Sequence, residues 1–361
     1  MKIEDRFTNI YSLAVERIRA VSSIQDDYSE FKNKTAIKRI FDPVSELYWT
    51  YYENITLKKS SKSDKTDPTI ILLHGICGTA GCYFYLFNKL TELGYRCISA
   101  QYPEYLTPYE WIAGFLHFIE YLNLSKPCVF GSDLGGFLVQ LFVQRYPDSL
   151  NSIILCNSYR RTDAFSVSPE FRDIYGNIYS ILPHIILKGL YLEYYICPKN
   201  DDHNQNKIEL REQYAREFMA YELDQLSSND LGSRITLQLT GEYVYDKDLS
   251  GFKKDKILLI ETNNNNIPEE LTQDIKAWYK NSKVGYIKNG GDFPYLTRPD
   301  EIAVYIQVHL NNIKYSQENN YNKLLSSESF NDSHTKTKTG NISRDEKVEI
   351  DYDSENSVIN L

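Results

Sequence analysis

The fold is decided by a glycine-rich turn that reads Cys128-Val129-Phe130-Gly131-Ser132-Asp133-Leu134-Gly135-Gly136. Apolar residues with a strand pattern lead into the turn, and an apolar helical pattern follows it at once. Gly131 and Gly135 stand two places before and two places after Asp133, which is the spacing of a nucleophile elbow, G-x-S-x-G. The small residues of such an elbow let strand and helix pack closely. Ser132 is one place out of register, so we expect its side chain not to point where an elbow nucleophile points.

Apolar, β-rich runs alternate with helical patterns on either side of this turn. The runs lie at residues 69–74, 96–100, 128–130 and 152–156, and the alternation resumes at 256–261 and 284–288. Alternating strands and helices predict an α/β fold with a doubly wound, mostly parallel sheet. The interval at about residues 160–238 has helical patterns of its own, so it predicts a helical cap inserted between two parts of one sheet.

Residues 316–361 differ in composition from the rest of the chain. They contain 11 apolar residues out of 46, whereas 42% of the whole chain is hydrophobic. So few apolar side chains cannot offset the entropy lost on ordering, and the segment is predicted to be a disordered polar tail. A short recognition segment around Val348–Tyr352 is the alternative. Residues 1–315 then form one domain, with the cap at about 160–238 inside it.

Composition and charge exclude several classes of protein. The 361 residues include 40 Lys and Arg against 49 Asp and Glu, a formal net charge of −9, which argues against nucleic acid as a partner. No apolar stretch approaches the length of a transmembrane helix, and the N-terminus does not have the pattern of a secretion signal. The six cysteines include no CxxC pair and are expected to be free thiols. We therefore expect a cytoplasmic protein with no metal and no cofactor.

A second motif, upstream of the turn, supports the elbow. It reads Ile71-Leu72-Leu73-His74-Gly75-Ile76-Cys77-Gly78. This is the pattern of the loop after the third strand of α/β-hydrolases, which supplies one N–H of the oxyanion hole, while the residue after the nucleophile supplies the other. Gly75, Ile76 and Leu134 are therefore the expected oxyanion-like residues. His74 ends the strand and is expected to brace the loop.

The remaining triad positions of an α/β-hydrolase are the acid and the base, in loops after two late strands. In the first loop, residues 258–268, Asn264 stands four residues before Pro268, where the acid usually stands. In the second loop, Gly290-Gly291-Asp292-Phe293-Pro294, Asp292 stands where the G-H-F-P pattern has its histidine. The three expected triad positions are thus Asp133, Asn264 and Asp292.

These three residues predict a hydrolase scaffold without hydrolase chemistry. An imidazole with a pKa near 6.5 takes and returns a proton at neutral pH, whereas a carboxylate with a pKa near 4 is a poor base. Loss of a comparable triad removes about 8 kcal/mol of transition-state stabilisation. Asp133 also has a purely structural explanation, because Asp tolerates the positive φ of an elbow and is favoured at a helix N-terminus.

Three alternatives stay open. In the first, Asp133 is itself the nucleophile, as in hydrolases that use G-x-D-x-G on an ester, an epoxide or an alkyl halide, and Asp292 has to activate water. In the second, the chain is a pseudoenzyme that binds a small ligand in a closed apolar pocket beneath residues 160–238. In the third, Asp133, Asn264 and Asp292 converge on a cation.

Several separated stretches resemble the maspardin family. They are residues 78–84, 94–103, 130–140, 154–158, 290–296 and 306–310. The resemblance covers most of residues 45–315 and implies a cytosolic, non-catalytic protein that acts through protein partners and associates with endosomal and trans-Golgi membranes. Maspardins generally retain Ser at the elbow, whereas this chain has Asp133. Cap and tail resemble the family less, so its partner, the cytoplasmic tail of a T-cell co-receptor, is not carried over.

Overall fold

The computed structural model describes the chain at residues 23–54, 68–165, 184–192, 209–245 and 251–316. The chain divides into two units, residues 1–313 and 314–361, and the sheet and the candidate site belong to the first. The expected polar tail, 316–361, lies outside the described residues except for its first residue. The domain boundaries therefore stay a prediction.

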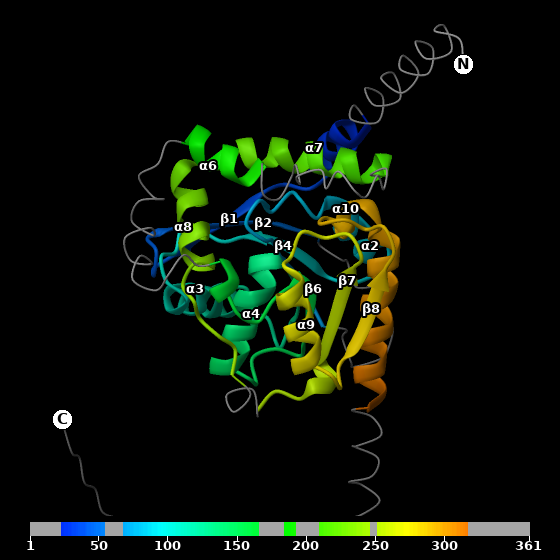
Figure 1. The fold of residues 1–361 in the computed structure, drawn as a ribbon. Coiled ribbons are helices and arrows are strands. Elements are labelled where there is room, and N and C mark those ends of the chain that lie inside the picture. The colour runs from blue at the N-terminus through cyan, green and yellow to red at the C-terminus, as the bar shows by residue number, and fades with distance from the viewer. Residues whose placement is uncertain (1–22, 55–67, 166–183, 193–208, 246–250, 317–361) are drawn as a thin grey trace, which may run out of the picture. The chain divides into compact units, whose positions relative to one another are not determined.

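Eight strands form one sheet in the order β1-β2-β4-β3-β5-β6-β7-β8 (Figure 1). The pairs β1–β2 and β2–β4 are antiparallel, and all other neighbouring pairs are parallel. The predicted mostly parallel, doubly wound sheet is thus confirmed. The strand bounds are β1 Lys38–Asp42, β2 Leu47–Glu53, β3 Ile70–Leu73, β4 Cys97–Gln101, β5 Cys128–Ser132, β6 Ser152–Ser158, β7 Ile257–Thr262 and β8 Lys283–Ile287.

Helices connect and cover the strands, and two of them begin at residues that cap them. Thr107 accepts a hydrogen bond from the Glu110 N–H and the Glu110 carboxylate accepts one from the Thr107 N–H, which is a capping box at the start of α3. Ser227 and Asp230 form the same box before α8. The helix bounds are α2 Phe84–Glu92, α3 Pro108–Tyr121, α4 Asp133–Arg145, α6 His184–Tyr191, α7 Leu210–Asp224, α8 Ser228–Gln238, α9 Glu269–Trp278 and α10 Pro294–Thr297, with further helices over residues 23–34 and 299–316.

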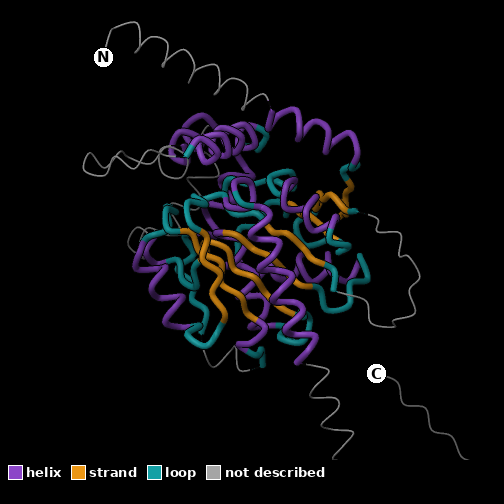
Figure 2. Tube along the Cα trace, turned by 90° about the vertical axis from the view of Figure 1, so that its right-hand side faces the viewer, coloured by secondary structure: helices purple, strands orange, loops and turns teal. Residues whose placement is uncertain are grey.

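Side chains of β2 show how helices cover both faces of the sheet. Trp49 stacks on Phe118 of α3 with 4.6 Å between ring centroids, whereas Tyr52 packs edge-on against Phe31 of the helix over residues 23–34, at 4.9 Å. Residues of opposite parity point to opposite faces of a strand, so these two helices lie on opposite sides of the sheet. Figure 2 shows helices on both faces of the twisted strands. The central strands β3, β5 and β6 are buried along their whole length, as expected for parallel strands covered on both faces.

Each of the six expected apolar runs overlaps a described strand, β3 to β8. The strands β1 and β2 have no counterpart among those runs. Buried positions are mixed with exposed or half-buried ones in both strands instead of forming continuous apolar runs, and β1 is one of the two edge strands of the sheet. The alternation in β1 is typical of an antiparallel strand with one solvated face, and a search for apolar runs detects neither strand.

The described chain between β6 and β7 is mainly helical, as expected for the cap, and comprises α6, α7 and α8. Figure 1 shows α6 and α7 above the sheet, with α7 near α10 and α6 near α8. Residues 166–183 and 193–208 of the expected cap lie outside the described residues. The five cysteines of the described part are free thiols. None of the described helices combines the length and the apolar character needed to cross a bilayer.

Candidate functional site

The elbow turn joins β5 to α4 at very close range. Asp133 is the first residue of α4 and has a φ of +48°, a backbone conformation that Asp adopts more readily than most residues. A Cβ atom on Gly135 would lie 2.5 Å from the His74 carbonyl oxygen, and one on Gly131 would lie 2.7 Å from the Gly136 Cα. Only glycine fits at these two places: Gly135 brings α4 against the end of β3, and Gly131 lets β5 and α4 pack against each other.

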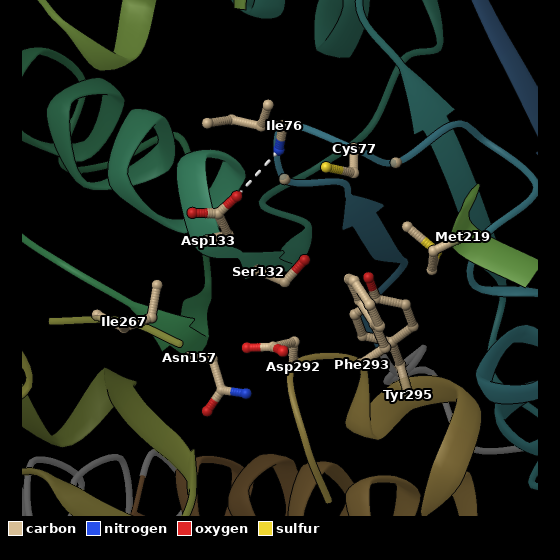
Figure 3. Close-up of a pocket in the computed structure, with 12 residues that line it drawn as sticks. Ile76, Cys77, Ser132, Asp133, Asn157, Met219, Ile267, Asp292, Phe293 and Tyr295 are labelled. Carbon is tan, nitrogen blue, oxygen red and sulfur yellow. Dashed lines mark hydrogen bonds between the residues drawn. The ribbon is translucent and has the colours of Figure 1, made fainter. Parts of the chain in front are cut away.

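The carboxylate of Asp133 accepts a hydrogen bond from an N–H of the oxyanion-like loop. The Ile76 N–H donates to Oδ2 of Asp133 at 3.0 Å (Figure 3). Burial raises the pKa of Asp133 to about 6, and the Ile76 hydrogen bond, the Leu134 amide and the Tyr159 hydroxyl limit this rise. The side chain at the nucleophile position therefore occupies the N–H groups that would otherwise bind the oxyanion of a substrate.

Ser132 is engaged in the core. Its hydroxyl lies 2.6 Å from the Tyr83 hydroxyl, which itself donates to the Leu73 carbonyl at 2.7 Å. Since the Tyr83 proton is used in that bond, Ser132 donates to Tyr83. The Ser132 side chain is almost fully buried, so its geometry is that of a structural hydroxyl.

Asp292, at the position of the expected base, is held by the neighbouring loop. The backbone N–H of Asn266 donates to Oδ1 of Asp292 at 2.6 Å and the Asn266 side-chain amide donates to Oδ2 at 2.8 Å. Burial raises the pKa of Asp292 to about 7; Asn266 and Arg216 lower it, whereas the charges of Glu212 and Asp133 raise it further. The sequence argument gave this carboxyl an ordinary pKa near 4, and that assumption was wrong because the group is withdrawn from water.

Asn264 does not pair with Asp292 but links the two late loops to the cap. Its side-chain oxygen accepts from the Gly291 N–H at 2.8 Å, and its amide donates to Glu212 of α7 at 2.6 Å. Glu212 forms an ion pair with Arg216 at 2.6 Å, and Arg216 also lies 3.6 Å from Asp292. The positions of the expected acid and base are therefore parts of one buried polar network with α7.

Sequence reasoning missed Glu212, Arg216 and Asn266. Glu212 and Arg216 stand four places apart on a helix, which is the usual pattern of a solvated surface pair. In the structure they are only 3% and 8% exposed. Asn266 lies in the run Asn263–Asn266, whose sequence does not distinguish one amide from the next. The elbow positions could be predicted because their spacing is fixed, whereas these contacts depend on how the cap packs.

Arg234 of α8 holds the oxyanion-like loop from the cap side. Its Nη1 donates to the carbonyls of Ile76 at 2.8 Å and Gly78 at 2.7 Å. His74 donates through Nδ1 to the Gly75 carbonyl at 2.7 Å and stacks on Tyr102. Burial, followed by the nearby charge of Arg234, lowers the pKa of His74 well below its usual value. The imidazole is therefore neutral and braces the loop.

A small cavity lies between the elbow and the late loops (Figure 3). Its volume is about 30 Å³, room for one or two water molecules. Asp133 and Asp292 line it, and no histidine is among the described residues around it. Cys77 also lines it, but burial and then the charge of Asp133 raise the pKa of its thiol, so a thiolate does not form near neutral pH. In the described part of the chain, His, Cys, Asp and Glu side chains form no group of three that could hold a metal ion.

The fold and the elbow define a class of protein, the α/β-hydrolase fold. A family model described as "alpha/beta hydrolase fold" matches residues 68–183. A carboxylesterase structure from Nitrososphaera gargenis is 14% identical and has a TM-score of 0.56, covering 77% of this chain and 100% of that one. An epoxide hydrolase of Vigna radiata is 12% identical with a TM-score of 0.53, covering 78% of this chain and 99% of that one. At such low identities these similarities show the fold alone.

Proteins of one family within this class have a higher sequence identity to this chain than those two structures have. Maspardin of Danio rerio is 30% identical over 295 residues, which are 80% of this chain and 86% of that protein. Maspardin of Homo sapiens is 29% identical over 290 residues, 80% of this chain and 87% of that protein. The chain belongs to the maspardin family.

Proposed function

We propose that this chain is a catalytically inactive α/β-hydrolase-fold protein that acts by binding a protein partner. The observation that carries the proposal is the hydrogen bond from the Ile76 N–H to Oδ2 of Asp133. A carboxylate that occupies this donor competes with the oxyanion of any bound substrate, and its negative charge repels it. The Ile76 N–H, which corresponds to an oxyanion donor of active α/β-hydrolases, is therefore occupied by the side chain of the elbow residue Asp133.

Two further features support inactivity. The cavity beside the elbow, about 30 Å³ in volume, does not accommodate an acyl group or an alkyl chain. Asp292 has both carboxyl oxygens engaged by Asn266, so it is not poised to activate a water molecule. The same small volume counts against a ligand-binding pseudoenzyme at this place.

The cellular setting is proposed on the family alone. Membership in the maspardin family favours a cytoplasmic protein that takes part in endosomal or trans-Golgi trafficking, or in receptor regulation, and that reaches these membranes through its partners. The net charge of −9 agrees with protein partners rather than nucleic acid.

An Asp-nucleophile hydrolase is the second candidate, because one observation favours it. The pKa of Asp292 is raised to about 7, which is the range of a general base at neutral pH. Asp133 and Asp292 line the same cavity, so a substrate bound there would meet both a nucleophile and a base.

Turnover measurements distinguish the two candidates. We expect the purified full chain to hydrolyse a short-chain ester, an epoxide and an alkyl halide no faster than its Asp133→Ala variant, and to resist labelling by a fluorophosphonate. Asp148→Ala, at an exposed position on the surface, is the matched control. Hydrolysis that Asp133→Ala abolishes and Asp148→Ala leaves unchanged would refute inactivity and support the Asp-nucleophile hydrolase.

A further inference from the structure

A second and larger cavity lies away from the elbow, with a volume of about 620 Å³. Ligand-binding clefts are typically of this size. The first turns of α3, the last turns of α4 and the residues Glu242, Tyr243 and Tyr245 line it. Figure 1 shows α3 and α4 side by side, with the chain that leaves α8 passing along them. We call this cavity the α3–α4 groove.

Tyrosine rings are the main feature of the α3–α4 groove. Tyr109, Tyr146, Tyr243 and Tyr245 all line it. Tyr109 is 75% exposed and Tyr245 is 51% exposed, and the rings of Tyr243 and Tyr245 stack at 6.1 Å between centroids. Such rings offer flat apolar faces and lose little conformational entropy on binding. The Tyr243 hydroxyl is already hydrogen-bonded with Asp163 and Arg161, so this residue offers its ring face alone.

Two charged side chains of opposite sign also line the groove. Arg145 and Glu242 are both members of its lining. Within the part of the chain that the structure describes, neither has a hydrogen-bond or ion-pair partner for its charged group. A ligand that brings one acidic and one basic group therefore gains two ion pairs without breaking one between the described residues.

The borders of the groove decide which kind of peptide fits. Two helices and the segment that ends at Tyr245 surround it. This segment pairs with residues 160–161, and the Gln144 side-chain amide donates to the Tyr245 carbonyl, so its backbone is not free to pair with an added strand. An amphipathic helix requires a continuous apolar surface, whereas hydroxyl groups and charges interrupt the apolar side chains here. Proline-rich segments dock in aromatic-lined grooves, because their preformed polyproline II helix packs proline rings on aromatic rings and leaves its carbonyls free to accept hydrogen bonds.

We propose that the α3–α4 groove binds a proline-rich segment of a partner protein, in the polyproline II conformation, with an acidic residue that pairs with Arg145 and a basic residue that pairs with Glu242. This inference rests on the proposed function, since it names the kind of partner that the protein binds. The tyrosine rings pack against the prolines, and the two ion pairs fix the direction of the bound segment.

Fluorescence anisotropy with a defined set of peptides tests the proposal. The set contains six consecutive prolines flanked by every combination of two of the twenty residues, one at each end, and a matched set has alanine in place of proline. We expect the proline peptides flanked by Arg and Glu to bind best and the alanine set not to bind. Tyr109→Ala and Tyr245→Ala should each weaken binding about tenfold, and Glu242→Gln should weaken only peptides with a basic flank.

Tyr286→Ala is the matched control, because Tyr286 on β8 is 55% exposed and lies outside the groove. All four substituted residues lie at least partly at the surface, and an unchanged melting temperature shows that each variant is folded. Absence of binding by every proline peptide overturns the proposal. So does binding that Tyr109→Ala and Tyr245→Ala leave unchanged, or that Tyr286→Ala weakens equally. Such a failure leaves catalytic inactivity untouched, because the turnover measurement tests that independently.

Discussion

Gly135→Ala is expected to destabilise the protein by about 3 kcal/mol or more, although Gly→Ala inside a helix usually stabilises it by about 1 kcal/mol. The new Cβ would lie 2.5 Å from the His74 carbonyl oxygen and 2.6 Å from the Leu73 carbonyl oxygen. Both atoms belong to the backbone at the end of β3, which cannot move without disturbing the parallel pairs of the sheet. The free energy of unfolding, measured by urea denaturation, gives the effect directly.

Gly189→Ala is the matched control for this change. Gly189 also lies in a helix, α6, but a Cβ there would have no atom within 4 Å. We expect this variant to be as stable as the original chain or more stable, by up to about 1 kcal/mol. Equal effects of the two substitutions would contradict the close packing of the elbow.

Asp133→Asn is expected to stabilise the protein at pH 8 by up to about 3 kcal/mol and to have little effect near pH 4. Burial raises the pKa of Asp133 to about 6, above its value in the unfolded chain. The neutral carboxyl therefore contributes its full stability below a pH of about 4, and this contribution is lost as the pH rises through about 6. An amide does not ionise, and its oxygen can still accept the Ile76 hydrogen bond.

The measurement is the difference in unfolding free energy between the variant and the original chain from pH 4 to pH 8. Taking this difference cancels the contributions of the other titrating groups to the pH dependence of stability. One of them is His309, whose pKa burial lowers to about 4, so its contribution to stability is lost as the pH falls and not as it rises. A difference that stays flat from pH 4 to pH 8 would mean that the Asp133 carboxyl is not buried.

The parts of the fold that local chemistry determines could be predicted from the sequence. The elbow needs glycine at Gly131 and Gly135 because the backbones of β5, α4 and β3 nearly touch there, and this requirement is visible as a fixed spacing. The fully buried parallel strands appear as continuous apolar runs for an equally direct reason. Both signals come from neighbours in the sequence.

The electrostatics of the candidate site could not be predicted in this way. The raised pKa of Asp292 arises from burial and from the charges of Glu212 and Asp133, 80 and 159 residues away in the sequence. The ion pair of Glu212 with Arg216 has the spacing of an ordinary surface pair, and only the packing of α7 over the late loops makes it a buried one. Properties that depend on such distant neighbours require the structure.

The most direct test of inactivity is the mass of the peptide that contains Asp133 after incubation with an ester, an epoxide and an alkyl halide in ¹⁸O-labelled water. A nucleophilic carboxylate forms a covalent ester with an epoxide or an alkyl halide, and a mixed anhydride with an ester whose alcohol leaves. Attack of water at the aspartate carbonyl carbon of either intermediate leaves a labelled oxygen on the aspartate. We predict an unchanged mass with every substrate, because the cavity beside Asp133 has a volume of only about 30 Å³ and Asn266 engages both carboxyl oxygens of Asp292. A covalent adduct on Asp133, or incorporation of ¹⁸O into its carboxyl group, would contradict the account.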